Sequence, residues 1–167
     1  SQPDYSDWWN QLNRLRETYP LGYDLPEDGS LSPQYVIERL GALSGPDSIY
    51  AAGVGQHQMW AAQYLRCGPR QCVSSAGLGT MGFGLPAAIG VQVALMDEQV
   101  VCIAGDASIL MNIQELGTLA AYGLPVKVVI VNNHWQGMVR QWQGSFYNER
   151  YSASDMLNGI SSQEIPE

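Results

Sequence analysis

The stretch GDASILMNIQELGTLAAYGLPVKVVIVNN, residues 105–133, decides the fold. The apolar run VVCIA precedes it, and a second apolar run, VKVVIV, lies near its end, just before two asparagines. Between the runs, apolar residues recur at helical spacing: Ile113, Leu116, Leu119 and Ala120. This pattern predicts two buried, parallel strands joined by a crossover helix.

Polar residues follow both predicted strands. Asp106 comes directly after the first strand, and Asn132 and Asn133 come directly after the second. The carboxyl ends of parallel strands meet at one edge of a sheet, where open α/β sheets bind ligands. Oxygen donors without a neighbouring Cys or His suit a hard cation such as Mg²⁺, which commonly also carries a phosphate. The stretch therefore predicts a site for Mg²⁺ and a phosphate-bearing ligand.

The rest of the chain repeats a strand, loop and helix pattern. We predict strands over residues 48–54, 71–75, 100–104 and 126–131, and helices over 59–65 and 84–96. This alternation predicts an α/β fold with a doubly wound parallel sheet. Such sheets commonly have five or six strands, so we expect this one to be truncated at the C-terminus. Residues 134–156 show no clear period, and no element is predicted there.

The N-terminal part lacks the repeating strand, loop and helix pattern. We interpret residues 1–30 as a linker segment with a short helix, and residues 31–167 as the domain. Ser6 is the predicted cap of the short helix. Its apolar face is expected to contain Trp8, Leu12, Leu15 and Tyr19. Ser32 and Pro33 occupy the cap and first-turn positions of the next helix.

Composition excludes several classes of protein. The chain has 167 residues, of which 46% are hydrophobic and 14% charged, so we expect an ordered, well-buried domain. A net charge of −8 disfavours nucleic acid as a partner. No apolar run approaches the roughly 20 residues that span a bilayer, so no membrane partner is expected. We interpret Cys67, Cys72 and Cys102 as three buried small hydrophobes in a reducing compartment.

Several local patterns leave alternatives open. GLGTMG, residues 77–82, satisfies the dinucleotide fingerprint G-x-G-x-x-G. In that fingerprint an acidic residue at the end of the next strand binds the ribose, whereas Asp97 lies before the next strand, which disfavours a dinucleotide site. The glycines still indicate close approach to a ligand or to another helix. His57 could face an anion at a helix start, or it could be a capping or packing residue. Trp135 and Trp142 lie where large aromatic side chains often line a pocket or a partner surface.

The motifs together resemble a known family. GDA (105–107) and NN (132–133) are similar to the thiamine diphosphate and Mg²⁺ motif of thiamine-dependent decarboxylases and carboligases. GVGQHQMWAAQ (53–63), GLGTMGFGLPAAIG (77–90), QGMV (136–139) and QWQ (141–143) narrow the resemblance to the catalytic, or large, subunit of acetolactate synthase, also called acetohydroxyacid synthase. The similarity extends from about residue 8 to residue 156.

The resemblance implies a set of site residues. Mg²⁺ would be held by Asp106, Asn133 and the backbone carbonyl of Trp135. Met81 would hold the cofactor in a bent conformation, and the Gly79 carbonyl would accept from its 4′-amino group. The remaining cofactor contacts would be Gln56, His57, Gly105, Ala107, Ser108, Gln136, Gly137 and Met138. Met138, Val139 and Trp142 would line the substrate channel.

The resemblance also implies an activity. Members of this family decarboxylate pyruvate and condense the two-carbon product with a second 2-keto acid, pyruvate or 2-ketobutyrate, in isoleucine and valine biosynthesis. They use thiamine diphosphate and Mg²⁺. FAD is expected in the full-length enzyme, bound mostly outside this stretch. A homodimer or tetramer is implied, with a small regulatory subunit as an additional partner, in the cytoplasm or in a plastid if a leader was lost.

The glutamate that activates the cofactor in this family belongs to an N-terminal domain, and nothing in this chain matches its context. Glu115 and Glu149 are expected to be structural or solvent-exposed. We therefore expect a fragment that is inactive alone. The alternatives are another thiamine diphosphate-dependent carboligase or oxidase, a catalytically silent cofactor-binding module, and a nicotinamide-binding domain.

Overall fold

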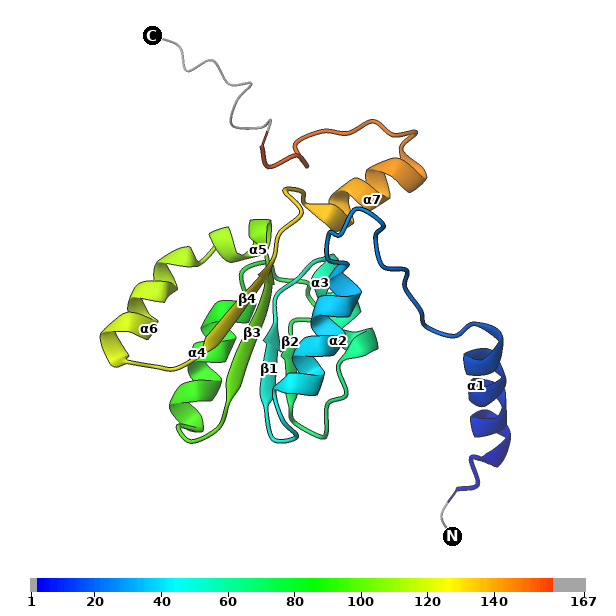
Figure 1. Ribbon diagram of the computed structural model, residues 1–167, viewed down its shortest axis with the longest axis horizontal. Coiled ribbons are helices and arrows are strands. Elements are labelled where there is room, and N and C mark those ends of the chain that lie inside the picture. The colour runs from blue at the N-terminus through cyan, green and yellow to red at the C-terminus, as the bar shows by residue number, and fades with distance from the viewer. Residues whose placement is uncertain (1–2, 158–167) are drawn as a thin grey trace.

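A four-stranded parallel sheet organises the computed structural model, which describes residues 3–157 (Figure 1). Its strands are β1 (Ile49–Ala52), β2 (Cys72–Ser74), β3 (Val100–Gly105) and β4 (Lys127–Val131), in the spatial order β2-β1-β3-β4. All three strand pairings are parallel. The chain winds outward in one direction from β1 and in the other from β3, which confirms the predicted doubly wound sheet.

The centre of the sheet separates two hydrophobic cores. Every residue of β3 is buried, and successive side chains point to opposite faces. Val101 and Ile103 pack under α2 (Pro33–Leu43) and α3 (Gln56–Tyr64). Val100, Cys102 and Ala104 pack under α4 (Gly84–Ala94) and α5 (Asp106–Leu110). A run that is apolar at every position is therefore required, because both faces of β3 are covered.

Strand β4 departs from the prediction of a buried strand. It lies at the edge of the sheet, and Ile130 is 50% exposed. Its residues are exposed or half-buried, whereas those of β3 are all buried.

The predicted crossover helix is interrupted. It consists of α5, a short 3₁₀ helix η1 (Ile113–Glu115) and α6 (Leu116–Tyr122). The break comes at Asn112, whose backbone φ of −139° is not helical. The expected apolar face is also largely exposed, since neither η1 nor α6 contains a buried residue. Gly123, with φ +62°, ends α6 in the left-handed conformation that glycine favours.

Helix α7 (Gly137–Phe146) was not predicted. Its apolar residues Met138, Trp142 and Phe146 are four positions apart, but Gly137 and Gly144 weaken the helical pattern. No residue of α7 is buried in the domain core. The helix lies across the end of the sheet at which β3 and β4 finish (Figure 1).

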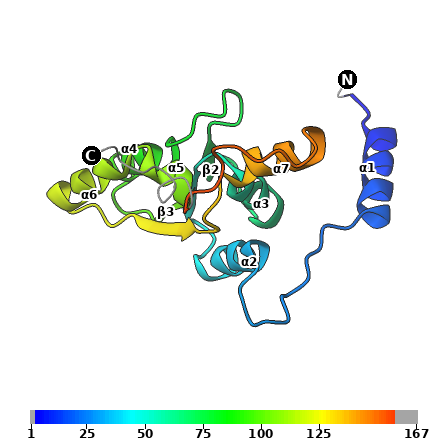
Figure 2. The same ribbon diagram turned by 90° about the horizontal axis from the view of Figure 1, so that it is seen from above.

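The N-terminal helix α1 (Ser6–Thr18) forms where it was predicted, but it contains no buried residue. Both views show it apart from the sheet (Figures 1 and 2). The cap residue of α1 is Tyr5, without a side-chain cap bond, and Ser6 is the first helical residue, so the prediction of Ser6 as the cap was wrong. Asp4 Oδ1 accepts from the Ser6 backbone N–H at 3.0 Å. The Ser32 cap of α2 is confirmed, since its hydroxyl accepts from Tyr35 N–H at 3.2 Å. The boundary between linker and domain stays a prediction.

The segment between α1 and α2 is held against the domain by Tyr23. Its hydroxyl donates to the Glu38 carboxylate, and its ring meets the edge of Tyr64 with centroids 5.4 Å apart. The bond to Glu38 raises the pKa of Tyr23 to about 12. None of the helices in residues 3–157 is long and apolar enough to cross a membrane.

The interpretation of three buried thiols was wrong. Cys67 and Cys72 form a disulfide between the end of α3 and the start of β2. Only Cys102 is a buried free cysteine, and burial raises the pKa of its thiol to about 11. The five-residue separation of the bonded pair carried no signal in the sequence, because it is typical of neither a metal site nor a known disulfide framework.

Candidate functional site

A cavity of about 560 Å³ opens at the carboxyl ends of β1, β3 and β4. It lies at the point where the strand order reverses, between β1 and β3. Every residue that the family resemblance assigns to the cofactor, the metal or the substrate channel lines this cavity. These residues are Gln56, His57, Gly79, Met81, Gly105, Asp106, Ala107, Ser108, Asn133, Trp135, Gln136, Gly137, Met138, Val139 and Trp142. The fold therefore brings them together, while their individual roles stay predictions.

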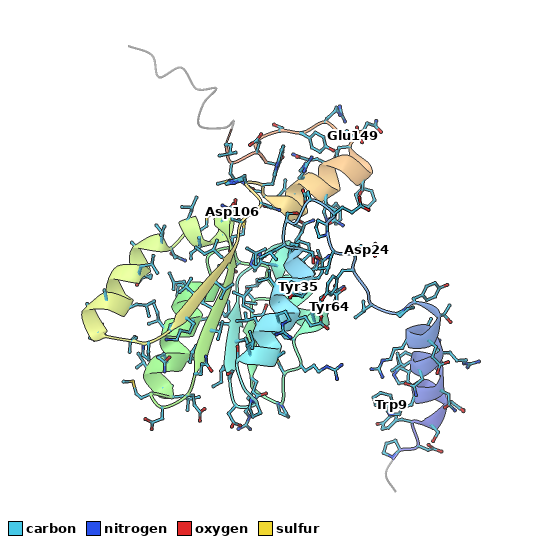
Figure 3. All side chains as sticks on the ribbon, viewed as in Figure 1. Trp9, Asp24, Tyr35, Tyr64, Asp106 and Glu149 are labelled. Carbon is cyan, nitrogen blue, oxygen red and sulfur yellow. A yellow bond between two sulfur atoms is a disulfide. The ribbon has the colours of Figure 1, made fainter. Side chains whose placement is uncertain are left out.

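Asp106 is the first residue of α5 and faces the cavity at the end of β3. Figure 3 shows it at the end of the sheet, beside the chain that leads into α7. Within residues 3–157, no hydrogen bond or ion pair engages its carboxylate. A carboxylate without a cationic partner that faces a cavity is suited to a bound cation.

The other predicted metal ligands lie just after β4. Asn133 Oδ1 accepts from the Trp135 backbone N–H at 3.0 Å, which turns the chain into the cavity wall. In the described part of the chain, no three His, Cys, Asp or Glu side chains gather as a metal cluster. A cation here would therefore rely on one carboxylate with amide, carbonyl and ligand oxygens. That donor set fits Mg²⁺ and does not suit a soft metal.

His57 is held by three glycines. It is only 5% exposed, and a Cβ added at Gly53, Gly55 or Gly105 would lie 2.9 Å from an atom of its ring. Burial lowers the pKa of His57 from 6.5 to about 4, against a smaller opposing effect of the Gly53 carbonyl. The ring is therefore neutral at pH 7, with one nitrogen able to donate and the other to accept.

Packing does not satisfy the imidazole completely. His57 Nε2 is buried and has no hydrogen-bond partner among the described residues. Buried polar atoms are almost always paired, so an orphaned nitrogen in a cavity wall calls for a ligand or an ordered water. His57 is thus both a packed residue and a candidate ligand contact, the two alternatives that its sequence position left open.

Helix α7 lies over the cavity and touches Gln56. Gln56 Nε2 donates to Gln141 Oε1 at 3.1 Å. A Cβ at Gly137 would lie 2.1 Å from Gln56 Oε1, so a larger residue here would displace the Gln56 amide from its contact with α7. Trp142 and Val139 line the cavity while staying 57% and 42% exposed, as side chains at its mouth would.

Some wall residues were not predicted. They are Val54, Gly55, Trp60, Val131, Gln143 and Tyr147. Val54, Gly55, Trp60 and Gln143 belong to motifs that carried the family resemblance, but Tyr147 carried no signal. Tyr147 directly follows α7, and that helix was not predicted.

Neither candidate glutamate belongs to the cavity wall. Glu115 accepts from Thr118 Oγ1 at 2.7 Å within the crossover. Glu149 is exposed in the loop after α7, at the far end of that helix from Asp106 (Figure 3). The expectation that both are structural or exposed agrees with these positions.

Comparison with known proteins identifies the family of this chain. Residues 53–165 match the family described as thiamine pyrophosphate enzyme, C-terminal TPP binding domain. The chain is 68% identical to an acetolactate synthase large subunit of Parasynechococcus marenigrum, over 96% of this chain and 26% of that protein. It is 54% identical to an acetolactate synthase of Mycobacterium bovis, over 98% of this chain and 26% of that protein. It is 53% identical to an acetolactate synthase large subunit of Porphyra purpurea, over 91% of this chain and 25% of that protein.

The chain spans about a quarter of the length of these relatives. The family match begins directly after β1 and includes β2, β3, β4 and all the residues that line the cavity. The chain therefore belongs to the thiamine pyrophosphate enzyme family, in which it corresponds to the C-terminal domain that binds thiamine pyrophosphate, also called thiamine diphosphate.

Proposed function

We propose that this chain is the thiamine diphosphate- and Mg²⁺-binding part of an acetolactate synthase large subunit. The observation that supports this most directly is the convergence of four separate sequence motifs on one cavity at the switch point of the sheet. The names of the three relatives support the assignment to acetolactate synthase over other carboligases.

The chain's own residues would hold the cofactor by its diphosphate end. Asp106, Asn133 and the Trp135 carbonyl would bind Mg²⁺, and the metal would bind diphosphate oxygens. The neutral His57 ring and the Gln56 amide would contact the same oxygens. When bound, thiamine diphosphate supplies a carbon nucleophile that adds to the keto carbon of a 2-keto acid, and it also stabilises the negative charge left by decarboxylation.

Other residues would set geometry and access. Met81 would support the cofactor in its bent conformation, and the Gly79 carbonyl would accept from its amino group, which is catalysis by proximity. Met138, Val139 and Trp142 would form an apolar entrance that excludes water from the reacting carbon. The acceptor would be pyruvate or 2-ketobutyrate, and FAD would be bound mostly by other parts of the full-length enzyme.

The chain on its own would bind the cofactor without completing the reaction, because no glutamate among residues 3–157 lines the cavity, where it could activate the aminopyrimidine. Incubation of the chain with pyruvate, thiamine diphosphate and Mg²⁺ should yield no acetolactate. Formation of acetolactate under these conditions would contradict this part of the proposal.

Calorimetric titration with thiamine diphosphate, with and without Mg²⁺, tests the cofactor site itself. Asp106→Ala should abolish the Mg²⁺-dependent part of binding, because it removes the only carboxylate among the proposed metal ligands. Asp97→Ala is the matched control, since it makes the same change in the exposed turn before the other end of β3. Retained Mg²⁺-dependent affinity in Asp106→Ala would refute the metal assignment. NAD binding in place of thiamine diphosphate would favour the dinucleotide alternative.

A further inference from the structure

Met81 lies in a tight turn within the loop between β2 and α4. Phe83 N–H donates to the Thr80 carbonyl at 3.3 Å, which closes a β-turn with Met81 and Gly82 at its two central positions. Gly82 has φ +84°, the left-handed conformation that a type II turn needs at its third residue. The backbone at Met81 is therefore defined by how its two neighbours are held.

Ser75 holds the side of the loop that precedes Met81. Its carbonyl accepts from Gly79 N–H at 2.8 Å, and its hydroxyl accepts from Thr80 N–H at 3.2 Å. These contacts lie within the loop itself, so they shape the loop but do not connect it to the rest of the cavity.

Two side chains from the crossover hold the other side. Gly82 is buried, and both of its backbone polar groups are satisfied by this segment. Gly82 N–H donates to Ser108 Oγ at 3.1 Å, and the Gly82 carbonyl accepts from Asn112 Nδ2 at 3.0 Å. A Cβ at Gly82 would lie 2.7 Å from Asn112 Nδ2 and 2.8 Å from Met111 Cβ, so Gly82 packs too closely against the crossover for a larger residue.

The same short segment carries the proposed metal ligand. Helix α5 starts at Asp106, and Asn112 follows its end by two residues, at the break in the crossover. Because the chain leaves helical geometry at Asn112, its side chain reaches back to Gly82. One rigid segment thus connects Asp106, at the diphosphate end of the cavity, with the turn that carries Met81.

We propose that Asn112 is a positioning residue: its hydrogen bond to the Gly82 carbonyl sets where Met81 stands in the cavity relative to Asp106. This inference deepens the proposed function and depends on it for the identity of the ligand. Asn112 does not line the cavity, so it would act only through the turn.

The first test needs no cofactor. The 18.3 kDa chain has six methionines, and carbon-13 labelling of their methyl groups makes each visible by NMR, with Met81→Leu assigning the Met81 signal. Asn112→Ala and Asn112→Asp, which keeps the side-chain shape but removes the donor, should shift or broaden the Met81 signal. Asn10→Asp, the same chemical change on exposed α1, should leave it unchanged. An unchanged Met81 signal in both Asn112 variants would overturn the proposal.

The second test is a double-mutant cycle read by calorimetry with thiamine diphosphate and Mg²⁺. Asn112→Asp should weaken binding roughly 10-fold, as the loss of one buried hydrogen bond would. In a Met81→Ala background the same substitution should have almost no further effect, because there is no side chain left to position. An equal loss in both backgrounds would mean a general structural role and would overturn the proposal. Failure of the unsubstituted chain to bind thiamine diphosphate would refute the proposed function instead, and the methyl signal would still decide the role of Asn112.

Discussion

The burial of His57 should make the protein sensitive to acid in a defined pH range. The pKa of this ring is about 4 in the folded chain and 6.5 without burial. Between these pH values the His57 ring is protonated in the unfolded chain but stays neutral in the folded chain. Stability from the neutral ring is therefore complete above pH 6.5 and is lost as the pH falls toward 4.

The size of the effect follows from the difference between the two pKa values. The full difference corresponds to about 3 kcal/mol, at roughly 1.4 kcal/mol for each pH unit. Lowering the pH from 7 to 4.5 covers most of this range and should reduce the free energy of unfolding by about 2 kcal/mol through His57 alone. Such a change is a sizeable part of the roughly 5–15 kcal/mol that stabilises a typical domain.

Urea unfolding at intervals from pH 7 to pH 4.5 measures this dependence. Carboxylates also titrate near the lower end, so the comparison is with His57→Gln, which cannot titrate at this position. The variant should lose the part of the pH dependence that belongs to His57. His134→Gln, a substitution at the other, exposed histidine, should retain it. Equal pH dependence in the unsubstituted chain and in His57→Gln would refute the reasoning.

Three further substitutions or treatments test the packing and the cavity. Gly84→Ala should cost about 1–3 kcal/mol of stability in urea unfolding, because the new Cβ would lie 2.7 Å from the Gly53 backbone nitrogen; Gly90→Ala, with nothing within 4 Å on the same helix, should be neutral or stabilising. Without reductant, a thiol reagent should label no cysteine in the native chain and only Cys102 after unfolding, while labelling of Cys67 or Cys72 would contradict the disulfide. Trp142→Leu should keep the affinity for thiamine diphosphate while changing acceptor preference in the full-length enzyme, and loss of cofactor affinity would mean that this residue is misplaced.

The sequence pattern was sufficient to predict those features of the structure that depend on residues close together in the chain. The Ser32 cap depends on a hydroxyl three residues before a backbone N–H, and the run of residues 100–104 could only suit a strand covered on both faces. Asp106 and Asn133 were also predictable, because the carboxyl ends of parallel strands meet at one edge of the sheet. The other site residues were predicted only from the resemblance of their motifs to a known family.

Contacts between distant segments decided the rest. At the break in the crossover, the Asn112 side-chain amide donates to the carbonyl of Gly82, 30 positions earlier, and no helical periodicity contains that information. His57 is neutral because Gly53, Gly55 and Gly105 close around its ring from two different strands' ends.

By itself, the sequence determined the four parallel strands and the place of Asp106 and Asn133 at the ligand-binding edge, because these depend on hydrophobic periodicity and chain direction, which are local properties. The prediction of the remaining site residues depended on the resemblance of their motifs to a known family. Only the tertiary structure decided how His57 is protonated and what holds Met81. Burial and hydrogen bonding between segments distant in the chain set those properties, and they exist only once the chain has folded.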